Sequence, residues 1–518
     1  MATTLNYAPS IARSRAEYST LFAGFLIFVT LYWLCIVVYR VFLSPLAKFP
    51  GPKLAAATGW YEGYFDIRKA NFPTVLERLH DEYGPIVRVN PWELSIRDAE
   101  YYNELYVPAG KRKTNLITMN RAGLGMSDAI STTGPHELHQ LRRKAVENFF
   151  SRQSVSRMES GIYEETKSLD DKLKRLAGTN ALINLDHAFA CVTGDLAALF
   201  ACGENPGLLE APNFNPEWYE TVAGILTMVP YVRNLPWLNT VLSIIPVALL
   251  NRLSSRVAGF RTFHELSRRR VTEVKRDIAS KGDISEYDKT SIFHHILKSN
   301  LPESEKDSGR LQREAFALLA AGTITTASTL SIITFYVLAN PHIESRLRDE
   351  LKGYWSGLGN NQSPRWAELE KIPYLHGCIK EGLRLSRFFR RSPRICPDQE
   401  LQYKQWTIPR NTPVGMSVCH LHMDPEVYPE PYKFDPERWI GDVDPRMNRN
   451  FVPFVKGSRN CLGMNLAWAE MFLVLGLLFR PGSHQMSLEC DESDIVLVHD
   501  SDVGIPKYDS IGLCVRFK

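Results

Sequence analysis

The sequence predicts a mainly α-helical protein with small β-sheets, folded as one large domain behind a single membrane-spanning helix. Helical patterns dominate the chain after residue 56, and only short β-prone pieces interrupt them. No linker rich in Gly, Ser or charge divides residues 57–518, so we expect one domain, although 518 residues would by length alone suggest about three. Residues 21–39 carry no charged side chain, which predicts the membrane helix.

The uncharged stretch from Leu21 to Tyr39 is close to the ~20 apolar residues that a helix needs to cross a bilayer. A cleaved signal peptide is the alternative, but its apolar region usually ends at small residues after about 7 to 15 positions, whereas Tyr39 is followed by Arg40. We therefore expect a short tail over residues 1–20 and a single-pass anchor over 21–39. Slightly more basic residues follow the anchor than precede it, which favours a cytosolic main body.

Residues 40–56 form the expected hinge between the anchor and the main domain, which would span residues 57–518. The hinge contains Phe49-Pro50-Gly51-Pro52, which interrupts any helix because proline lacks an amide donor and restricts the residue before it. Beyond the hinge, the β-prone pieces are Pro85 to Val89, Glu93 to Ile96 and Tyr403 to Ile408.

The clearest helix runs from about Leu311 to Leu338, and at roughly 1.5 Å per residue it would be about 40 Å long, enough to cross the domain. Gly322 lies inside it at a cost of about 1 kcal/mol relative to alanine, and the threonines beside it compete for backbone carbonyls. We therefore expect a break in the helix near Gly322.

A second apolar region, residues 218–250, is punctuated by Pro230, Pro236 and Pro246. No span in it is long enough to cross a membrane. It predicts either core helices whose ends the prolines mark, or a mobile lid over an apolar pocket that also touches the membrane surface.

Charge and cysteine content exclude several classes of protein. The formal net charge is only +4, so the sequence lacks the basic footprint of a nucleic-acid-binding protein. The nine cysteines are odd in number and show neither CxxC nor Cys/His zinc spacing, which argues against a disulfide framework and a zinc site. This usage is typical of a reducing compartment, where a single thiolate can be kept for chemistry.

Cys461 is the cysteine with the most distinctive surroundings. A free cysteine is often only a small buried hydrophobe, but this one belongs to a ten-residue pattern, F-x-x-G-x-R-x-C-x-G. The pattern suits a thiolate that ligates an iron: the first glycine permits a tight turn, the second lets a flat macrocycle approach the backbone, and the arginine can pair with a carboxylate. Its fixed positions are Phe454, Gly457, Arg459, Cys461 and Gly463.

This stretch resembles the heme-ligand signature of the cytochrome P-450 family at all five positions. The resemblance implies the fold of that family and a heme b cofactor whose iron is bound by the thiolate of Cys461. It extends from the hinge to about Phe479. Phrases such as YGPIVRVN are most similar to filamentous fungal enzymes of secondary metabolism, including the trichodiene-oxygenase-like group.

Glu381 and Arg384 stand three apart on a predicted helix and therefore share one face. By themselves they would be read as a surface ion pair. In their position before the cysteine they resemble the family's E-x-x-R pair, and Arg438 resembles its third partner. The resemblance implies that these three residues brace the heme-binding core, which is a structural role.

Residues 321–326, AGTITT, resemble the oxygen-activating stretch of the family's central helix. Thr325 matches the threonine whose hydroxyl helps to deliver protons when dioxygen is activated; an ordinary helix threonine is the alternative. The preceding position is usually Asp or Glu, but here it is Ile324, so the resemblance implies a relay that uses water, Thr323 or Thr326, or one that runs poorly. We expect Ile324→Asp to raise the fraction of electrons that end in product.

His139 and Arg143 stand four apart and resemble the family's W-x-x-x-R, with histidine in place of tryptophan. The resemblance implies that both donate to a heme propionate, and Arg394 resembles a further propionate partner. A solvated basic helix face is the alternative for the first two.

The leading hypothesis is a heme-thiolate monooxygenase that hydroxylates, epoxidises or desaturates an apolar secondary metabolite, with a terpenoid or meroterpenoid favoured. NADPH–cytochrome P-450 reductase would supply the electrons, with cytochrome b5 as a second donor, because the chain has no GxGxxG nicotinamide segment. The resemblance to microsomal members implies the endoplasmic reticulum, with the catalytic domain facing the cytosol. The expected pocket lining comprises residues around 116–130, residues 316–325, parts of 218–250, Phe388 and Phe389.

Two alternatives stay open. Ile324 suggests an oxygen-independent heme-thiolate isomerase or dehydratase, as some relatives with altered central helices are. The other alternative is a non-catalytic membrane heme protein that binds a ligand or partner.

Overall fold

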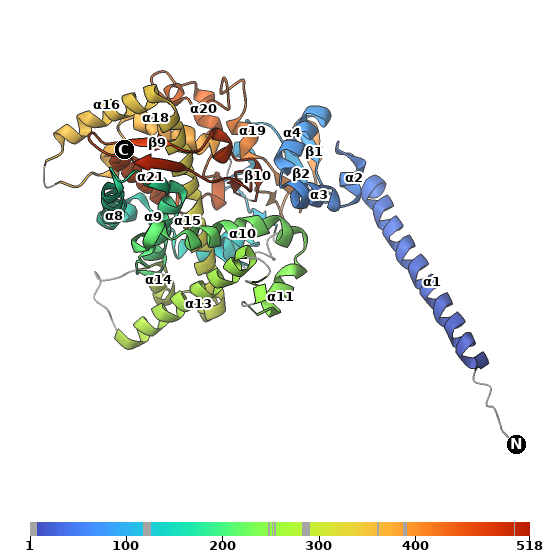
Figure 1. Ribbon diagram of the computed structural model, residues 1–518. Coiled ribbons are helices and arrows are strands. Elements are labelled where there is room, and N and C mark those ends of the chain that lie inside the picture. Colours follow the sequence, from blue (N-terminus) through green and yellow to red (C-terminus); the bar gives the residue numbers. More distant parts are fainter. Residues whose placement is uncertain are drawn as a thin grey trace.

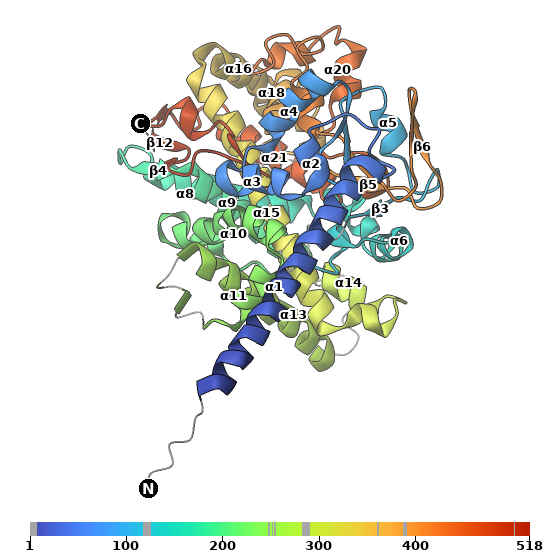
Figure 2. The ribbon, with the colours of Figure 1, turned by 90° about the vertical axis from the view of Figure 1, so that its right-hand side faces the viewer.

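The N-terminal helix stands apart from the rest of the protein (Figure 1). The computed structural model describes residues 8–117, 126–246, 249, 250, 252, 255–281, 291–359, 362–386, 391–501 and 503–517. Helix α1 (Ala8–Val38) continues through a π-helical turn, η1 (Tyr39–Leu43), and projects from the main body in both views (Figures 1 and 2). Its apolar span, Tyr18–Leu43, is exposed and extends beyond both ends of the predicted anchor.

Two further helices among the described residues are long and apolar enough to cross a membrane, but both are largely buried in the main body. They are α9 (Leu185–Cys202) and α15 (Ser308–Ala339). The exposed α1 is therefore the candidate membrane anchor.

The hinge packs against the main domain. The main-chain N–H of Arg88 donates to the carbonyl of Pro50 (2.7 Å), and its guanidinium donates to the carbonyl of Arg40 (2.8 Å). Gly51 has a φ of 148°, and a Cβ there would lie 2.6 Å from the Arg88 carbonyl oxygen. Only glycine fits so close to a neighbouring backbone.

Helix α15 runs through the centre of the main body, within three residues of the predicted bounds (Figure 1). It is continuous, so the break expected near Gly322 is absent from this described helix. Gly322 instead lets α15 approach α9, because a Cβ at this position would lie only 2.7 Å from that of Ala197. Across the same contact, the Thr193 hydroxyl donates to the carbonyl of Thr323 (2.7 Å). Close helix packing thus explains the glycine.

A five-stranded sheet joins the two halves of the chain in the order β1-β2-β8-β5-β3. Strands β2 and β8 are parallel, and the other neighbours are antiparallel. The strands are β1 (Ile86–Arg88), β2 (Leu94–Ile96), β3 (Asn115–Leu116), β5 (Arg394–Ile395) and β8 (Pro413–Gly415). The β-prone pieces at 85–89 and 93–96 contain β1 and β2.

Three smaller sheets lie among the described residues. They pair β6 (Leu401–Tyr403) with β7 (Trp406–Ile408), β10 (His499–Asp500) with β11 (Gly504–Ile505), and β12 (Cys514–Phe517) with both β4 (Leu182–Asn184) and β9 (Met486–Leu488). The β-prone piece at 403–408 is therefore not one strand. It contains the turn between β6 and β7, where Lys404 has a φ of 48°.

The apolar region at 218–250 forms α10 (Pro216–Asn234) and α11 (Trp237–Ile244). Pro230 lies inside α10, so it does not mark a helix end as predicted, whereas Pro236 directly precedes α11. Helix α10 buries Val222, Ile225 and Val229. Residues of α11 are exposed, with Ile244 at 76%.

The other described α-helices are α2 (Lys53–Ala57), α3 (Trp60–Lys69), α4 (Phe72–Tyr83), α5 (Tyr102–Leu105), α6 (His136–Lys144), α7 (Arg152–Arg157), α8 (Glu159–Leu176), α13 (Ser255–Lys281), α14 (Ile292–Lys298), α16 (Pro341–Gly357), α17 (Trp366–Leu369), α18 (Pro373–Leu385), α19 (Val418–His422), α20 (Pro445–Asn450) and α21 (Met464–Leu478). Of these, α13, α16, α18 and α21 pack directly against α15. The main hydrophobic core lies between α8, α9, α15, α18 and α21.

Candidate functional site

Cys461 lies in the loop between α20 and α21, three residues before α21 begins. Its N–H donates to the carbonyl of Phe454 (2.9 Å), which closes the loop on itself. The side chain is exposed at the surface of the chain. The protein atoms packed around it still raise the pKa of the thiol, because they disfavour the charged thiolate. The N–H of Gly463 and the charge of Arg143 act against this rise, because both stabilise the thiolate.

The two glycines of the motif have different surroundings. Gly457 has a φ of 80°, and a Cβ on it would lie 2.6 Å from the carbonyl oxygen of Val107 and 2.7 Å from that of Tyr106. A side chain is therefore excluded at Gly457 by a neighbouring backbone. Around Gly463 no heavy atom of another residue lies within 4 Å of the Cβ position, so the chain leaves open space beside the residue that donates to the thiol.

A group of cationic residues surrounds His139, and we call it the cationic group. His139 is 3% exposed, and its pKa is lowered to about 3, first by burial and then by the positive charges around it. Those charges come from separate parts of the chain, which the fold brings together. They belong to Arg459, Arg143 and Arg394.

The arginines of this group are held by their own contacts. Arg143 donates to the carbonyl (2.8 Å) and to the side-chain oxygen (2.7 Å) of Asn460, the residue before Cys461. Arg459 donates to the carbonyls of Thr133 (2.6 Å) and Gly134 (2.7 Å). Both arginines therefore tie the cysteine loop to α6 and the residues before it.

Arg394 lies on β5 and is 3% exposed. It donates to the hydroxyl of Ser392 (2.7 Å) and stacks over the ring of Tyr106, at 4.9 Å from its centroid. The structure thus brings Arg394, which precedes Cys461 by many residues, into the cationic group.

The structure also brings Glu381, Arg384 and Arg438 together; the first two are fully buried, and the side chain of Arg438 is 7% exposed. The Glu381 carboxylate accepts two bonds from Arg384 (2.7 and 2.9 Å) and one from Arg438 (3.0 Å). It also accepts from the indole of Trp439 (2.9 Å), and Arg384 donates to the carbonyl of His422 (2.9 Å). The three residues therefore lock α18 to the loops before the cysteine.

Thr325 lies in the middle of α15, on a face that stays partly open although the helix crosses the core. The hydroxyl of Thr325 donates to the carbonyl of Ala321 (2.9 Å), and Ala321 is exposed. Ile324, by contrast, is only 5% exposed and packs in the main hydrophobic core. Thr323 is fully buried, and its hydroxyl donates back to Leu319 (2.7 Å).

Glu470 is a buried acid next to the 321–326 stretch that the sequence did not indicate. It lies on α21, is 2% exposed and forms a hydrogen bond with the hydroxyl of Thr326. Burial raises the pKa of Glu470 to about 8, which favours the neutral acid at neutral pH. The available signal was a single acidic residue within the otherwise uncharged sequence of α21.

Some of the predicted pocket lining lies outside the described residues. This holds for Phe388, Phe389 and residues 118–125. Within the described part, Phe316 is buried and packs against His264, with ring centroids 4.2 Å apart, so it belongs to the core.

Comparison with known proteins gives one consistent family. The family model for cytochrome P450 matches residues 58–497. A cytochrome P450 monooxygenase (sdnH) of Sordaria araneosa is 43% identical over 506 residues, which cover 93% of each chain. A fusicoccadiene C-8 hydroxylase of Phomopsis amygdali is 42% identical, covering 95% of each chain, and a stellatic acid synthase of Emericella variicolor is 39% identical, covering 98% of this chain and 97% of its own.

These matches cover the helical body, the cysteine loop and the five-stranded sheet together. Members of this family carry a heme-thiolate iron and receive electrons from redox partners. The chain belongs to the cytochrome P450 family and is a monooxygenase, hence an oxidoreductase.

Proposed function

We propose that this enzyme oxidises an apolar terpenoid or meroterpenoid and that Cys461 is the axial ligand of a heme b. The observation that carries the proposal is the pairing of an accessible thiol with a backbone donor from Gly463, beside a group of cationic side chains. A relative 42% identical is called a fusicoccadiene C-8 hydroxylase, which supports a terpenoid.

The residues present fit a heme. Heme needs one strong axial ligand, space for a flat ring against the backbone, and cationic partners for its two propionates. Cys461 would supply the ligand, and the open space beside Gly463 suits the ring. Arg143, Arg394 and Arg459 would be the cationic partners, and the neutral His139 would donate an N–H to a propionate. Phe454 would flank the ligand loop.

The chain's own residues have distinct tasks in this proposal. Gly463 and Arg143 favour the thiolate form of Cys461, and Glu381, Arg384 and Arg438 keep the supporting loops in place. The bound heme supplies the oxidation of carbon atoms by dioxygen, which no side chain can perform. Thr325 would hold and pass a proton on the open face of α15, where Ala321 leaves room for an apolar substrate.

We further propose that NADPH–cytochrome P450 reductase supplies the electrons, with cytochrome b5 as a second donor, and that the enzyme resides in the endoplasmic reticulum with its main body in the cytosol. The exposed α1 helix and the slight excess of basic residues after it support this placement.

The first test is the absorption spectrum of the purified, reduced, carbon-monoxide-bound protein, compared with that of Cys461→Ser. Thiolate ligation predicts a Soret band shifted to the red in the natural protein and lost in the variant. An identical band in both proteins would remove Cys461 from the site.

Turnover with reductase and labelled dioxygen then separates the remaining functions. Label in the product excludes an oxygen-independent isomerase and a non-catalytic heme protein. Product that forms without dioxygen or NADPH would overturn the monooxygenase assignment for this substrate.

A further inference from the structure

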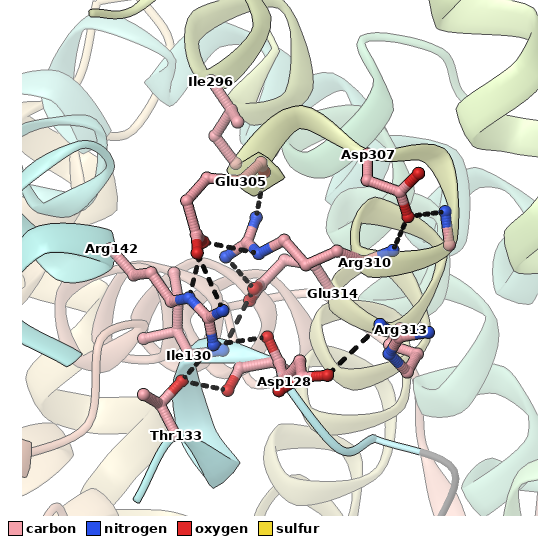
Figure 3. A network of polar contacts seen from close by, with 12 residues as sticks. Asp128, Ile130, Thr133, Arg142, Ile296, Glu305, Asp307, Arg310, Arg313 and Glu314 are labelled. Carbon is pink, nitrogen blue, oxygen red and sulfur yellow. Dashed lines mark hydrogen bonds and ion pairs between the residues drawn. The ribbon is translucent and has the colours of Figure 1, made fainter. Parts of the chain in front are cut away.

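A buried network of charged side chains lies where α15 begins (Figure 3). It joins Arg142 of α6, Glu305 of the short helix η7 (Glu303–Lys306), and Arg310 and Glu314 of α15. All four residues are between 1% and 8% exposed. No sequence motif predicted it, because its members are spread over three elements.

Two ion pairs form the centre of the network. Arg142 donates to both carboxylate oxygens of Glu305, at 2.7 and 3.1 Å, in a bidentate pair. Arg310 donates to Glu314 at 2.9 Å and lies 3.3 Å from Glu305. Because charges this deeply buried are costly to desolvate, such a network is weak evidence for a gain in stability. It does fix directions, since a guanidinium and a carboxylate bind in few orientations.

The other hydrogen bonds that Arg142 and Glu314 form go to one segment, residues 128–133. Glu314 accepts the main-chain N–H of Ile130 at 3.0 Å. Arg142 donates to the carbonyl of Asp128 (2.9 Å) and to the hydroxyl of Thr133 (2.8 Å). In Figure 3 these groups converge on the segment from α6 and from α15. Both ends of the segment are thus held by buried charges.

The same segment and the same helix also hold the cysteine loop. The carbonyl of Thr133, whose hydroxyl binds Arg142, accepts from Arg459 at 2.6 Å. Arg143, next to Arg142 on α6, binds Asn460. Two adjacent arginines therefore reach in different directions, one to the start of α15 and one to the residue before Cys461.

We propose that Glu314 and Arg142 are positioning residues of the heme-thiolate site. By fixing the 128–133 segment and α6 on α15, they set the position of the Thr133 carbonyl that holds Arg459, and of Arg143, which holds the cysteine loop. The proposal rests on the function proposed above. It adds two residues that contact neither Cys461 nor the heme that the cationic group would bind.

The test uses Glu314→Gln in the full-length holoprotein. Glutamine keeps the size and can still accept from Ile130, but it removes the charge that pairs with Arg310. We expect heme transfer to apomyoglobin to become about tenfold faster, equivalent to about 1.4 kcal/mol. We also expect a larger fraction of the reduced carbon-monoxide complex to lose the red-shifted band, and faster amide hydrogen exchange at Ile130.

Arg142→Lys is the second variant, in case Glu314→Gln does not fold. It keeps the charge but cannot reach Glu305, Asp128 and Thr133 at once, so the same changes are expected. Two control variants separate positioning from loss of stability. Asp170→Asn removes another buried carboxylate, paired with Arg480 and His484, and Arg313→Gln removes an exposed contact to Asp128 at 3.3 Å.

The outcomes are distinct. Faster heme release in Glu314→Gln or Arg142→Lys, with release unchanged in both controls, supports the proposal. Unchanged release in both variants overturns it, and so does an equal acceleration in Asp170→Asn, since general destabilisation would then suffice. A natural protein without any thiolate band would instead refute the proposed function.

Discussion

Ile324 and Thr325 are neighbours in the chain but lie in different surroundings. The hydroxyl of Thr325 is on the partly open face of α15, whereas Ile324 is packed in the apolar core. An acid placed at 324 would therefore be buried among hydrocarbon side chains, and its pKa would rise until it was neutral. In this structure, the primary effect of Ile324→Asp is therefore on the packing of the hydrophobic core, and an effect on proton delivery is secondary.

We accordingly expect Ile324→Asp to lower the stability of the holoprotein by at least about 3 kcal/mol, because it removes buried apolar volume and adds an unpaired polar group. Ile324→Val, the matched control, should cost about 0.5–1.5 kcal/mol. Urea unfolding followed by the Soret band measures both. A stable Ile324→Asp protein with better coupling would contradict this and support the relay expectation.

Single residues also show what a sequence can reveal. The five positions of the cysteine motif and the Glu381 and Arg384 pair could be pointed out because each has a short, fixed spacing along the chain, whereas Arg438 was indicated only by family resemblance. Glu470 could not be assigned, because its partner Thr326 lies on another helix and only folding brings them together.

At the scale of elements, the close contact between α9 and α15 depends on the absence of a side chain at Gly322. Gly322 faces Ala197, and the Thr193 hydroxyl binds the Thr323 carbonyl beside it. The length of α15 could be predicted from its uninterrupted apolar pattern. Whether α15 breaks at Gly322 could not be predicted from the sequence. A glycine in a helix permits either a kink or the close approach of another helix, and the sequence does not show that α9 packs there.

Gly322→Ala should destabilise the protein even though alanine is the better helix former by about 1 kcal/mol. The new Cβ would push α9 away, at a cost of about 1–3 kcal/mol for overpacking. Adding Ala197→Gly should recover most of the loss. Thermal unfolding of Gly322→Ala, Ala197→Gly and the double variant measures this coupling. A stabilised Gly322→Ala single variant would show that the two helices can separate freely.

At the scale of the whole molecule, the candidate site is assembled from segments far apart in the chain. Arg143 and Asn460 are 317 residues apart, and β2 pairs with β8 from the other half of the chain. Family resemblance pointed to Arg143 and Arg394 separately, but no local pattern relates either of them to Asn460 or Thr133. The network around Arg142 and Glu314 has no motif at all, so only the fold shows it.

The exposed surface predicts two modes of membrane contact. The first is insertion of the apolar α1. The second is contact through exposed apolar side chains of the main body, since four of them are more than half exposed: Trp60 and Tyr64 on α3, and Trp237 and Ile244 on α11. Deleting residues 8–38 should therefore abolish carbonate-resistant membrane association but leave weaker binding to vesicles in flotation assays. Trp237→Ser with Ile244→Ser in the deleted protein should remove that remainder. Carbonate extraction of the full-length protein would contradict an integral anchor.

The 317-residue separation of Arg143 and Asn460 also determines how much time passes between the synthesis of these two hydrogen-bond partners. At about 5–20 residues per second, a ribosome needs roughly 15–60 s to add the second partner after the first. During that interval α1 has already emerged, while α6 still lacks the loop that it binds. The candidate anchor thus leaves the ribosome long before the cysteine loop can bind α6, and throughout that interval Arg143 lacks its partner.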